Sequence, residues 1–226
     1  MFFGLFLPLL FGTIVLLLFV GSVDWFGTLF GRQPIRGRWW MWIAVALVAA
    51  PIALRLAGID FGGYDVRVIA LTFASGLLIG LTEEVLTRGI AVKLLRDAGY
   101  REVAVAVISS AIFALLHATN ILSGQPVLTV LATVGFAFGF GMMMYLVLRA
   151  TGNLVWPILL HALTDPTTFL ATGGIDVAHG DQNTLIGLAG PFNLVSVVFA
   201  LVALFLIRGR VKAIDPAPTM PEDGKA

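Results

Sequence analysis

Seven long apolar runs decide what this chain of 226 residues can fold into. They lie at about 2–20, 39–56, 68–88, 103–120, 127–148, 154–171 and 185–207. A helix that spans a membrane needs about 20 apolar residues and satisfies all of its own backbone hydrogen bonds. The runs do not alternate polar and apolar residues as the strands of a membrane barrel do. The sequence therefore predicts an all-α, polytopic transmembrane helical bundle with about seven spanning helices.

The composition excludes the main soluble alternatives. Charged residues make up 12% of the chain and its net charge is only +1, whereas soluble domains carry about 25% charged residues. These values exclude a soluble enzyme, a nucleic-acid binder and a disordered protein. The chain contains no cysteine, which excludes disulfides, thiolate metal sites and a cysteine nucleophile. We expect one transmembrane domain over residues 1–207 and a disordered cytoplasmic tail over 208–226.

The distribution of basic residues predicts the orientation. Most Lys and Arg residues fall on one side, in the first, third and fifth connections and after the last run, whereas Arg55 and Arg67 fall on the other. The first group consists of Arg32, Arg36, Arg38, Lys93, Arg96, Arg101, Arg149, Arg208, Arg210, Lys212 and Lys225. We expect a multi-pass plasma membrane protein of prokaryotic type, with its N-terminus outside and its C-terminus in the cytoplasm. The first run lacks a basic flank and a cleavage site, so we interpret it as a retained helix.

Ionisable residues inside the runs indicate a polar site. Each costs at least about 2.5–3.5 kcal/mol at mid-membrane, yet three runs carry them. The group consists of Glu83, Glu84 and Arg88 in the third run, His117 in the fourth, and His161 and Asp165 in the sixth. We expect these side chains to line one cavity. His179 lies in a short connection, and we interpret it as a surface residue.

Spacing separates the two carboxylates. Glu84 and Arg88 are four residues apart and predict an ion pair that supports the helix. Glu83 is rotated by about 100° from Glu84, so it either faces the cavity or forms an interhelical hydrogen bond as a neutral acid. His161 and Asp165 share one helix face. Two glycine pairs, 76/80 and 135/139, predict close helix contacts.

The order of these motifs resembles a known family. Glu83-Glu84-x-x-x-Arg88, Phe113-x-x-x-His117 and His161-x-x-x-Asp165 are similar to the motifs of the CPBP family of intramembrane proteases. These are the CAAX protease and bacteriocin-processing (Abi) proteins, which include the type II CAAX prenyl endopeptidase. The resemblance covers about residues 68–171, and each motif alone is weak.

The resemblance implies an intramembrane endopeptidase whose site opens to the cytoplasmic side. Glu83 would be the general base, and His117 would help to bind and polarise the water. His161 and Asp165 would stabilise the oxyanion, while Glu84 and Arg88 would hold the site together. The implied substrate is a hydrophobic, lipidated or membrane-inserted peptide.

Asp165 departs from the family pattern, in which asparagine is commonest at this position. An ionised aspartate accepts hydrogen bonds and repels an oxyanion. It would act as a donor only when protonated, or it would orient His161 or bind a metal. A zinc site made of Glu83, His117 and His161 is the alternative to a glutamate-type reaction without a cofactor; we favour the latter, because no His-Glu-x-x-His motif is present.

The depths of these groups predict a long third helix. If that helix ended near Arg88, Glu83 would lie about 8 Å from the interface and His117 about 21 Å from it. A third helix that continues past Leu94, followed by an interfacial segment within the amphipathic stretch 89–100, would bring the two to one level.

Two other functions remain open. A proton-coupled transporter would distribute its carboxylates along a path through the membrane, whereas here they form one cluster. A non-catalytic immunity or scaffold protein of the same fold would not need Glu83, His117 and His161, all of which are present.

Overall fold

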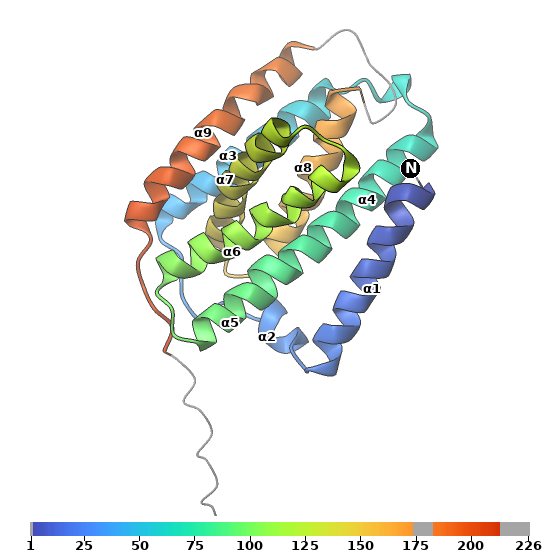
Figure 1. Ribbon diagram of the computed structural model, residues 1–226. Helices are drawn as coiled ribbons and strands as arrows, with labels where there is room; N and C mark the ends of the chain where they lie inside the picture. Colours follow the sequence, from blue (N-terminus) through green and yellow to red (C-terminus); the bar gives the residue numbers. More distant parts are fainter. Residues whose placement is uncertain (1, 174–182, 213–226) are drawn as a thin grey trace, which may run out of the picture.

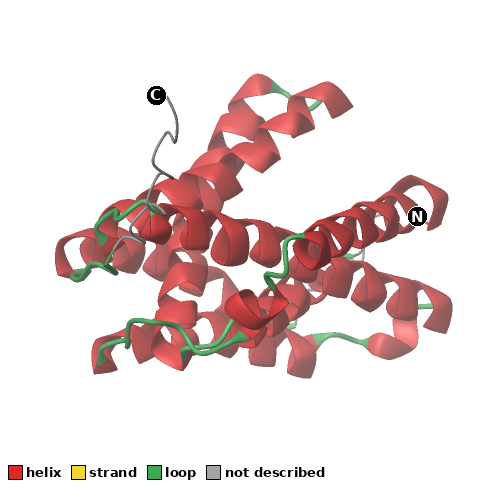
Figure 2. Cartoon of the chain, turned by 90° about the horizontal axis from the view of Figure 1, so that it is seen from below, coloured by secondary structure: helices red, strands yellow, loops and turns green. Residues whose placement is uncertain are grey.

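The computed structural model describes residues 2–173 and 183–212, and this part of the chain consists of helices and loops without a strand (Figures 1 and 2). The main helices are α1 (Leu7–Ser22), α2 (Phe26–Phe30), α3 (Trp42–Gly58), α4 (Val66–Glu84), α5 (Val92–Asp97), α6 (Glu102–Leu116), α7 (Val127–Thr151), α8 (Val155–Ala171) and α9 (Thr184–Leu206). The predicted all-helical class is confirmed. His179 and residues 213–226 of the tail lie outside the described residues.

Each of the seven predicted apolar runs overlaps one of the longer helices. Six helical segments of the described chain are long and apolar enough to cross a membrane: 3–22, 39–58, 66–97, 102–123, 127–151 and 184–206. The expected seventh, α8, has 17 residues. The prediction of about seven spanning helices is therefore close, and the protein is a multi-pass membrane protein.

Helix α8, with 17 residues, is shorter than each of the six spanning segments and lies among its neighbours (Figure 1). It packs against α4, α3 and α7. Because protein surrounds it on several sides, its polar side chains face other helices, an arrangement in which membranes tolerate such groups.

Two glycines allow α4 to approach α8 closely. A Cβ atom at Gly80 would lie 2.7 Å from the amide nitrogen of Ala162, and one at Gly76 would lie 2.8 Å from its carbonyl oxygen. That carbonyl receives no helical hydrogen bond, because Pro166 has no amide hydrogen. The predicted contact of this glycine pair is confirmed. In the second pair Gly139 approaches Val197, but Gly135 has no neighbour within 4 Å of a built Cβ, so the prediction for Gly135 is wrong.

The third membrane helix is long, as the depths of the polar groups predicted. Helix α4 continues through a π-helical turn, Val85–Ala91, into α5, and the helical segment runs from Val66 to Asp97. Residues 89–97 of the amphipathic stretch belong to this helix, and their place at the interface stays a prediction. Its polar side chains find partners in the protein: Lys93 pairs with Asp97, and Arg96 binds Glu102 on α6.

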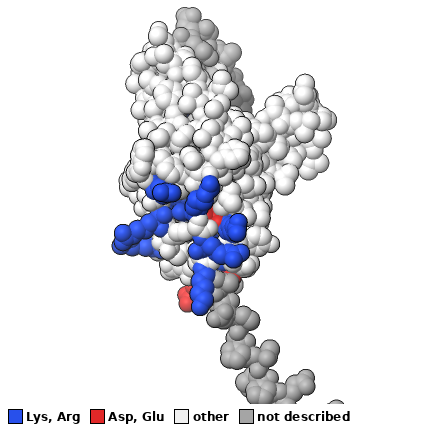
Figure 3. All heavy atoms as spheres, turned by 90° about the vertical axis from the view of Figure 1, so that its left-hand side faces the viewer, with Lys and Arg blue, Asp and Glu red and all other residues white. Residues whose placement is uncertain are grey.

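The loops at one end of the bundle are bound to each other. The backbone N–H of Gln33 donates to the carbonyl of Gly152, and the backbone N–H of Glu102 donates to the carbonyl of Gly209. Lys and Arg side chains gather at one end of the molecule (Figure 3). We call the end formed by residues 31–38, 98–101, 152–154 and 207–212 the basic end.

Arg96 and Arg149, counted above as loop residues, are buried at this end. Both donate to the carboxylate of Glu102, which is itself fully buried, and the Tyr145 hydroxyl also donates to it. The attraction between opposite charges at close range offsets the free-energy cost of removing them from water. These groups therefore form an internal ion cluster rather than a solvated loop.

Candidate active site

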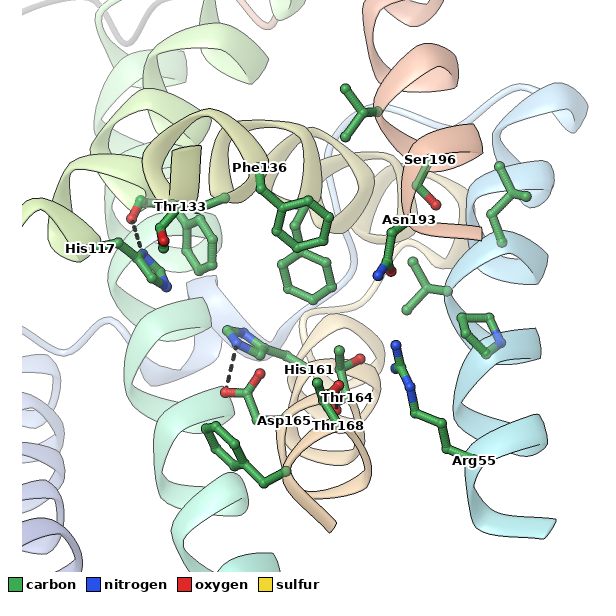
Figure 4. Close-up of a pocket in the computed structure, with 18 residues that line it drawn as sticks. Arg55, His117, Thr133, Phe136, His161, Thr164, Asp165, Thr168, Asn193 and Ser196 are labelled. Carbon is green, nitrogen blue, oxygen red and sulfur yellow. Dashed lines mark hydrogen bonds and ion pairs between the residues drawn. The ribbon is translucent and has the colours of Figure 1, made fainter. Parts of the chain in front are cut away.

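A cavity of about 200 Å³ opens between α3, α6, α7, α8 and α9 (Figure 4). His117, His161 and Asp165 line it, together with aromatic side chains from α6 and α7. Three of the residues predicted from the sequence thus share one cavity. The other three, Glu83, Glu84 and Arg88, lie on the α4 segment beside them.

Glu84 joins two of the predicted groups. Its carboxylate is fully buried and lies 3.2 Å from Arg88 Nη1, which is the ion pair that the spacing predicted. The same oxygen, Oε1, accepts a hydrogen bond of 2.9 Å from His161 Nδ1. Glu84 therefore holds His161 across the α4–α8 contact that the glycines permit.

Arg88 connects α4 to α6 and α7. Its Nη1 donates to the Thr87 hydroxyl at 2.5 Å, and its Nη2 donates to the carbonyl of Gly141 at 2.8 Å. The guanidinium carbon lies 4.4 Å from the centre of the Phe113 ring, within the range of a cation–π contact. A Cβ atom at Gly141 would lie 3.0 Å from Arg88 Nη2. The arginine is thus held in place by three neighbouring groups, and its supporting role in a reaction stays a prediction.

The π-helical turn lies directly after the two glutamates. π-helical turns are rare and are frequent at functional sites. The Thr87 hydroxyl donates to the carbonyl of Glu83 at 2.5 Å, so it satisfies a backbone group at the start of the turn. The turn and its side-chain bond fix the segment that carries both carboxylates.

His117 is held in one tautomer at the C-terminal end of α6. Its Nδ1 lies 3.2 Å from the carbonyl oxygen of Phe113. Because a carbonyl only accepts, Nδ1 must carry the hydrogen, and in the neutral ring Nε2 then presents a lone pair. The rings of His117 and His161 both contact the ring of Phe113, with centroid distances of 5.1 and 5.6 Å.

Glu83 is beside the cavity and not among the side chains that line it. It lies close enough to interact electrostatically with His161, His117 and Asp165. Its Oε2 is buried and has no hydrogen-bond partner among the described residues. Within the described residues, Oε2 therefore does not form the interhelical hydrogen bond that was the alternative prediction.

The two helices bring Glu83 and His117 to one level. At a rise of about 1.5 Å per residue, Glu83 lies about 21 Å from Asp97, and His117 lies about 22 Å from Glu102. Both helix ends are at the basic end, so the cavity lies in the half of the bundle away from it. This position differs from the predicted opening on the basic, cytoplasmic side. The family resemblance implied that opening, whereas the depth of the cavity follows from the lengths of the two helices.

Asp165 faces His161 from one turn further along α8. Its Oδ2 lies 3.6 Å from His161 Nε2 (Figure 4). Both ring nitrogens of His161 therefore face carboxylates, Glu84 at Nδ1 and Asp165 at Nε2. Of the roles left open for Asp165, this contact favours the orientation of His161.

The zinc alternative requires three converging ligands. Within residues 2–173 and 183–212, no group of three or more His, Asp or Glu side chains has a geometry that would hold a metal ion. His161 Nδ1 is already bound by Glu84. As arranged here, Glu83, His117 and His161 do not fit a zinc ion.

The sequence did not reveal three further polar residues of the cavity. Arg55 comes from α3, and Asn193 and Ser196 come from α9 (Figure 4). Arg55 was counted above only for its side of the membrane, opposite the basic connections. The signal that would have identified it is a cation in the last turn of an apolar run, since such residues normally face the bundle interior.

Comparisons with known proteins agree with the motifs. The family model described as Type II CAAX prenyl endopeptidase Rce1-like matches residues 65–167. No curated protein and no solved structure matches the chain. The matched segment includes all six predicted site residues, it confirms the resemblance inferred above, and its family implies an intramembrane protease. Residues 65–167, the segment that carries the buried polar cluster, thus match the Rce1-like type II CAAX prenyl endopeptidase family.

Proposed function

We propose that this protein hydrolyses a peptide bond of a membrane-associated substrate, with Glu83 as the general base and without a metal ion. The observation that carries the proposal is the Glu83 carboxylate. Its Oε2 is buried, unbound within the described chain, and close to two histidines and the cavity. A carboxylate kept without a structural partner in a membrane protein is a candidate for function.

The proposed reaction needs one water molecule. Glu83 takes a proton from this water, while His117 Nε2 accepts a hydrogen bond from it and fixes its position. The resulting hydroxide attacks the carbonyl carbon of the peptide bond. The protonated Glu83 then gives its proton to the leaving amine, so the proton balance closes.

His161 provides the second part of the mechanism. The tetrahedral intermediate carries negative charge on its oxygen, and a fixed donor aimed at that charge lowers the barrier by about 3–4 kcal/mol. His161 Nε2 carries the donor hydrogen when the ring is doubly protonated; Glu84 then faces Nδ1 and Asp165 faces Nε2. Glu84 and Arg88 keep the ring in place.

The substrate is proposed to be a hydrophobic or lipidated peptide. The family name refers to a prenyl endopeptidase, and the cavity of this chain is lined mainly by apolar side chains. With the basic end in the cytoplasm, the cavity would lie in the outer half of the membrane. Substrate would then enter from the bilayer or from the outer surface.

The experiment compares purified wild type with Glu83→Gln and Glu83→Ala in detergent. A mixed library of hydrophobic and farnesylated peptides is incubated with each protein, with and without a chelator, and products are identified by mass spectrometry. The matched control is Asp24→Asn, which removes one carboxylate from an exposed position. We expect cleavage by wild type and by the control, resistance to the chelator, and a loss of at least about a hundredfold in both Glu83 variants.

Two results would contradict the proposal. Loss of cleavage with the chelator would assign the reaction to a metal ion. Cleavage by Glu83→Gln at the wild-type rate would remove Glu83 from the mechanism. If wild type cleaved nothing in the library, the non-catalytic and transport alternatives would be favoured.

A further inference from the structure

Arg55 is a buried cation in the wall of the cavity. Its side chain is 7% exposed, and α3 directs it into the cavity from the side opposite His117 in the view of Figure 4. Within the described residues no carboxylate lies within 4 Å of its guanidinium, and no hydrogen bond involves it. A buried arginine without a partner is costly, so its presence requires an explanation.

Nearby acids do not provide that partner. Asp165 lines the same cavity, but its carboxylate faces His161 Nε2 at 3.6 Å. Glu84 is occupied by Arg88 and His161. The other buried arginines contrast with Arg55, because Arg88, Arg96 and Arg149 each bind a buried glutamate.

Two donors on α9 face the same space. Asn193 and Ser196 line the cavity, and in Figure 4 the guanidinium of Arg55 points toward Asn193. Neither side chain forms a hydrogen bond to another described residue. An amide and a hydroxyl both donate, so three side chains with unused donors lie in one part of the cavity.

The threonines of the cavity differ from this group. The hydroxyls of Thr133, Thr164 and Thr168 each donate to a carbonyl of their own helix, at 2.9, 2.7 and 2.7 Å. They therefore have no hydrogen left for a ligand. The unused donors are confined to the α3–α9 wall, away from His117.

We propose that Arg55, with Asn193 and Ser196, binds a carboxylate of the peptide substrate. The planar fork of an arginine fits a carboxylate with two parallel hydrogen bonds. With the carboxylate at this wall, the peptide extends across the cavity toward His161 and His117. Arg55 thus determines specificity and the position of the cut; the inference rests on the proposed function, because it takes the cavity as the substrate site.

The test measures binding separately from cleavage. Wild type, Arg55→Gln and Arg55→Lys are prepared in the Glu83→Gln background, so that the peptide stays intact. The probe is a fluorescein-labelled peptide that ends in farnesylated cysteine and three apolar residues, made with a free C-terminal carboxylate and as the amide. A second pair of peptides has an amidated C-terminus and carries either Asp or Asn within its apolar segment. Comparison of the two pairs distinguishes a side-chain carboxylate from the C-terminal carboxylate.

We expect the protein with intact Arg55 to bind one of the acid peptides about tenfold to a hundredfold more tightly than its neutral partner. Arg55→Gln should reduce that ratio to about one, and Arg55→Lys should give an intermediate ratio because it keeps the charge without the fork. The matched control is Arg67→Gln, at an exposed arginine, which should leave the ratio unchanged.

Three outcomes would overturn the inference. The first is an unchanged acid-to-neutral ratio in Arg55→Gln. The second is the same loss of ratio in Asp176→Asn or Asp181→Asn, two acids outside the described residues, which would assign Arg55 to an internal ion pair. The third is displacement of the acid peptide by phosphatidylglycerol with intact Arg55 but not in Arg55→Gln, which would assign Arg55 to a lipid phosphate. Because binding is measured without turnover, failure of the proposed hydrolysis leaves these results readable.

Discussion

His161 Nδ1 and Glu84 Oε1 form a 2.9 Å hydrogen bond between residues that lie 77 positions apart in the chain. The bond couples α8, with its cavity-lining histidine, to the α4 segment that carries both glutamates. Glu84 also binds Arg88, which contacts α6 and α7. One fully buried carboxylate thus joins the four helices that carry or support the predicted site residues.

The two adjacent glutamates should respond differently to the same substitution. Glu84→Gln leaves Arg88 and His161 without their charged partner, and removal of one member of a buried pair costs about 3–5 kcal/mol. Glu83→Gln removes no hydrogen bond of Oε2 and should leave stability within about 1 kcal/mol of wild type. Thermal unfolding in detergent measures both, and we expect activity to be lost in each. Equal melting temperatures for the two variants would contradict the supporting role of Glu84.

Asp165 should tolerate asparagine better than alanine. The Asn side-chain oxygen keeps an acceptor facing His161 Nε2, whereas Ala leaves the ring without this contact. We expect Asp165→Asn to keep kcat within about tenfold of wild type and Asp165→Ala to lose more. Because Asp165 acts through His161, the pH–rate profile should shift in both variants. An unchanged profile in Asp165→Ala would contradict the positioning role.

Gly80→Ala should separate α4 from α8. The added Cβ would lie 2.7 and 2.8 Å from backbone atoms of Ala162 and Ile158, which cannot move aside as a side-chain end can. Overpacking of this kind costs about 1–3 kcal/mol, and it should also weaken the Glu84–His161 bond. Gly135→Ala is the matched control, since nothing lies within 4 Å and alanine favours a helix by about 0.5–1 kcal/mol. A melting temperature in Gly80→Ala at or above that of the control would contradict the contact.

The orientation can be tested directly because the chain contains no cysteine. Single variants Ala98→Cys, at the basic end, and Ser123→Cys, at the opposite end, place one thiol on exposed residues of each end. A membrane-impermeant maleimide applied to intact cells should label only Ser123→Cys, and permeabilised cells should show both. The opposite pattern would reverse the topology and place the cavity in the cytoplasmic half.

The sequence by itself determined the class of fold and the members of the polar cluster. Runs of about 20 apolar residues leave the chain few structures other than membrane helices. The high cost of charge in lipid makes Glu83, His117 and His161 stand out without any knowledge of their partners. The ion pair of Glu84 and Arg88 also followed from local spacing alone, because four residues form about one helical turn.

The tertiary structure decided how the groups meet. The bond between Glu84 and His161, the depth of the cavity and the burial of Glu102 depend on which helices are neighbours, and residue periodicity carries no such information. The same limit explains why the sequence did not place Arg55 in the cavity: a cation near a helix end either reaches the interface or turns inward. For Arg55 the packing of α3 against α8 and α9 selected the inward direction.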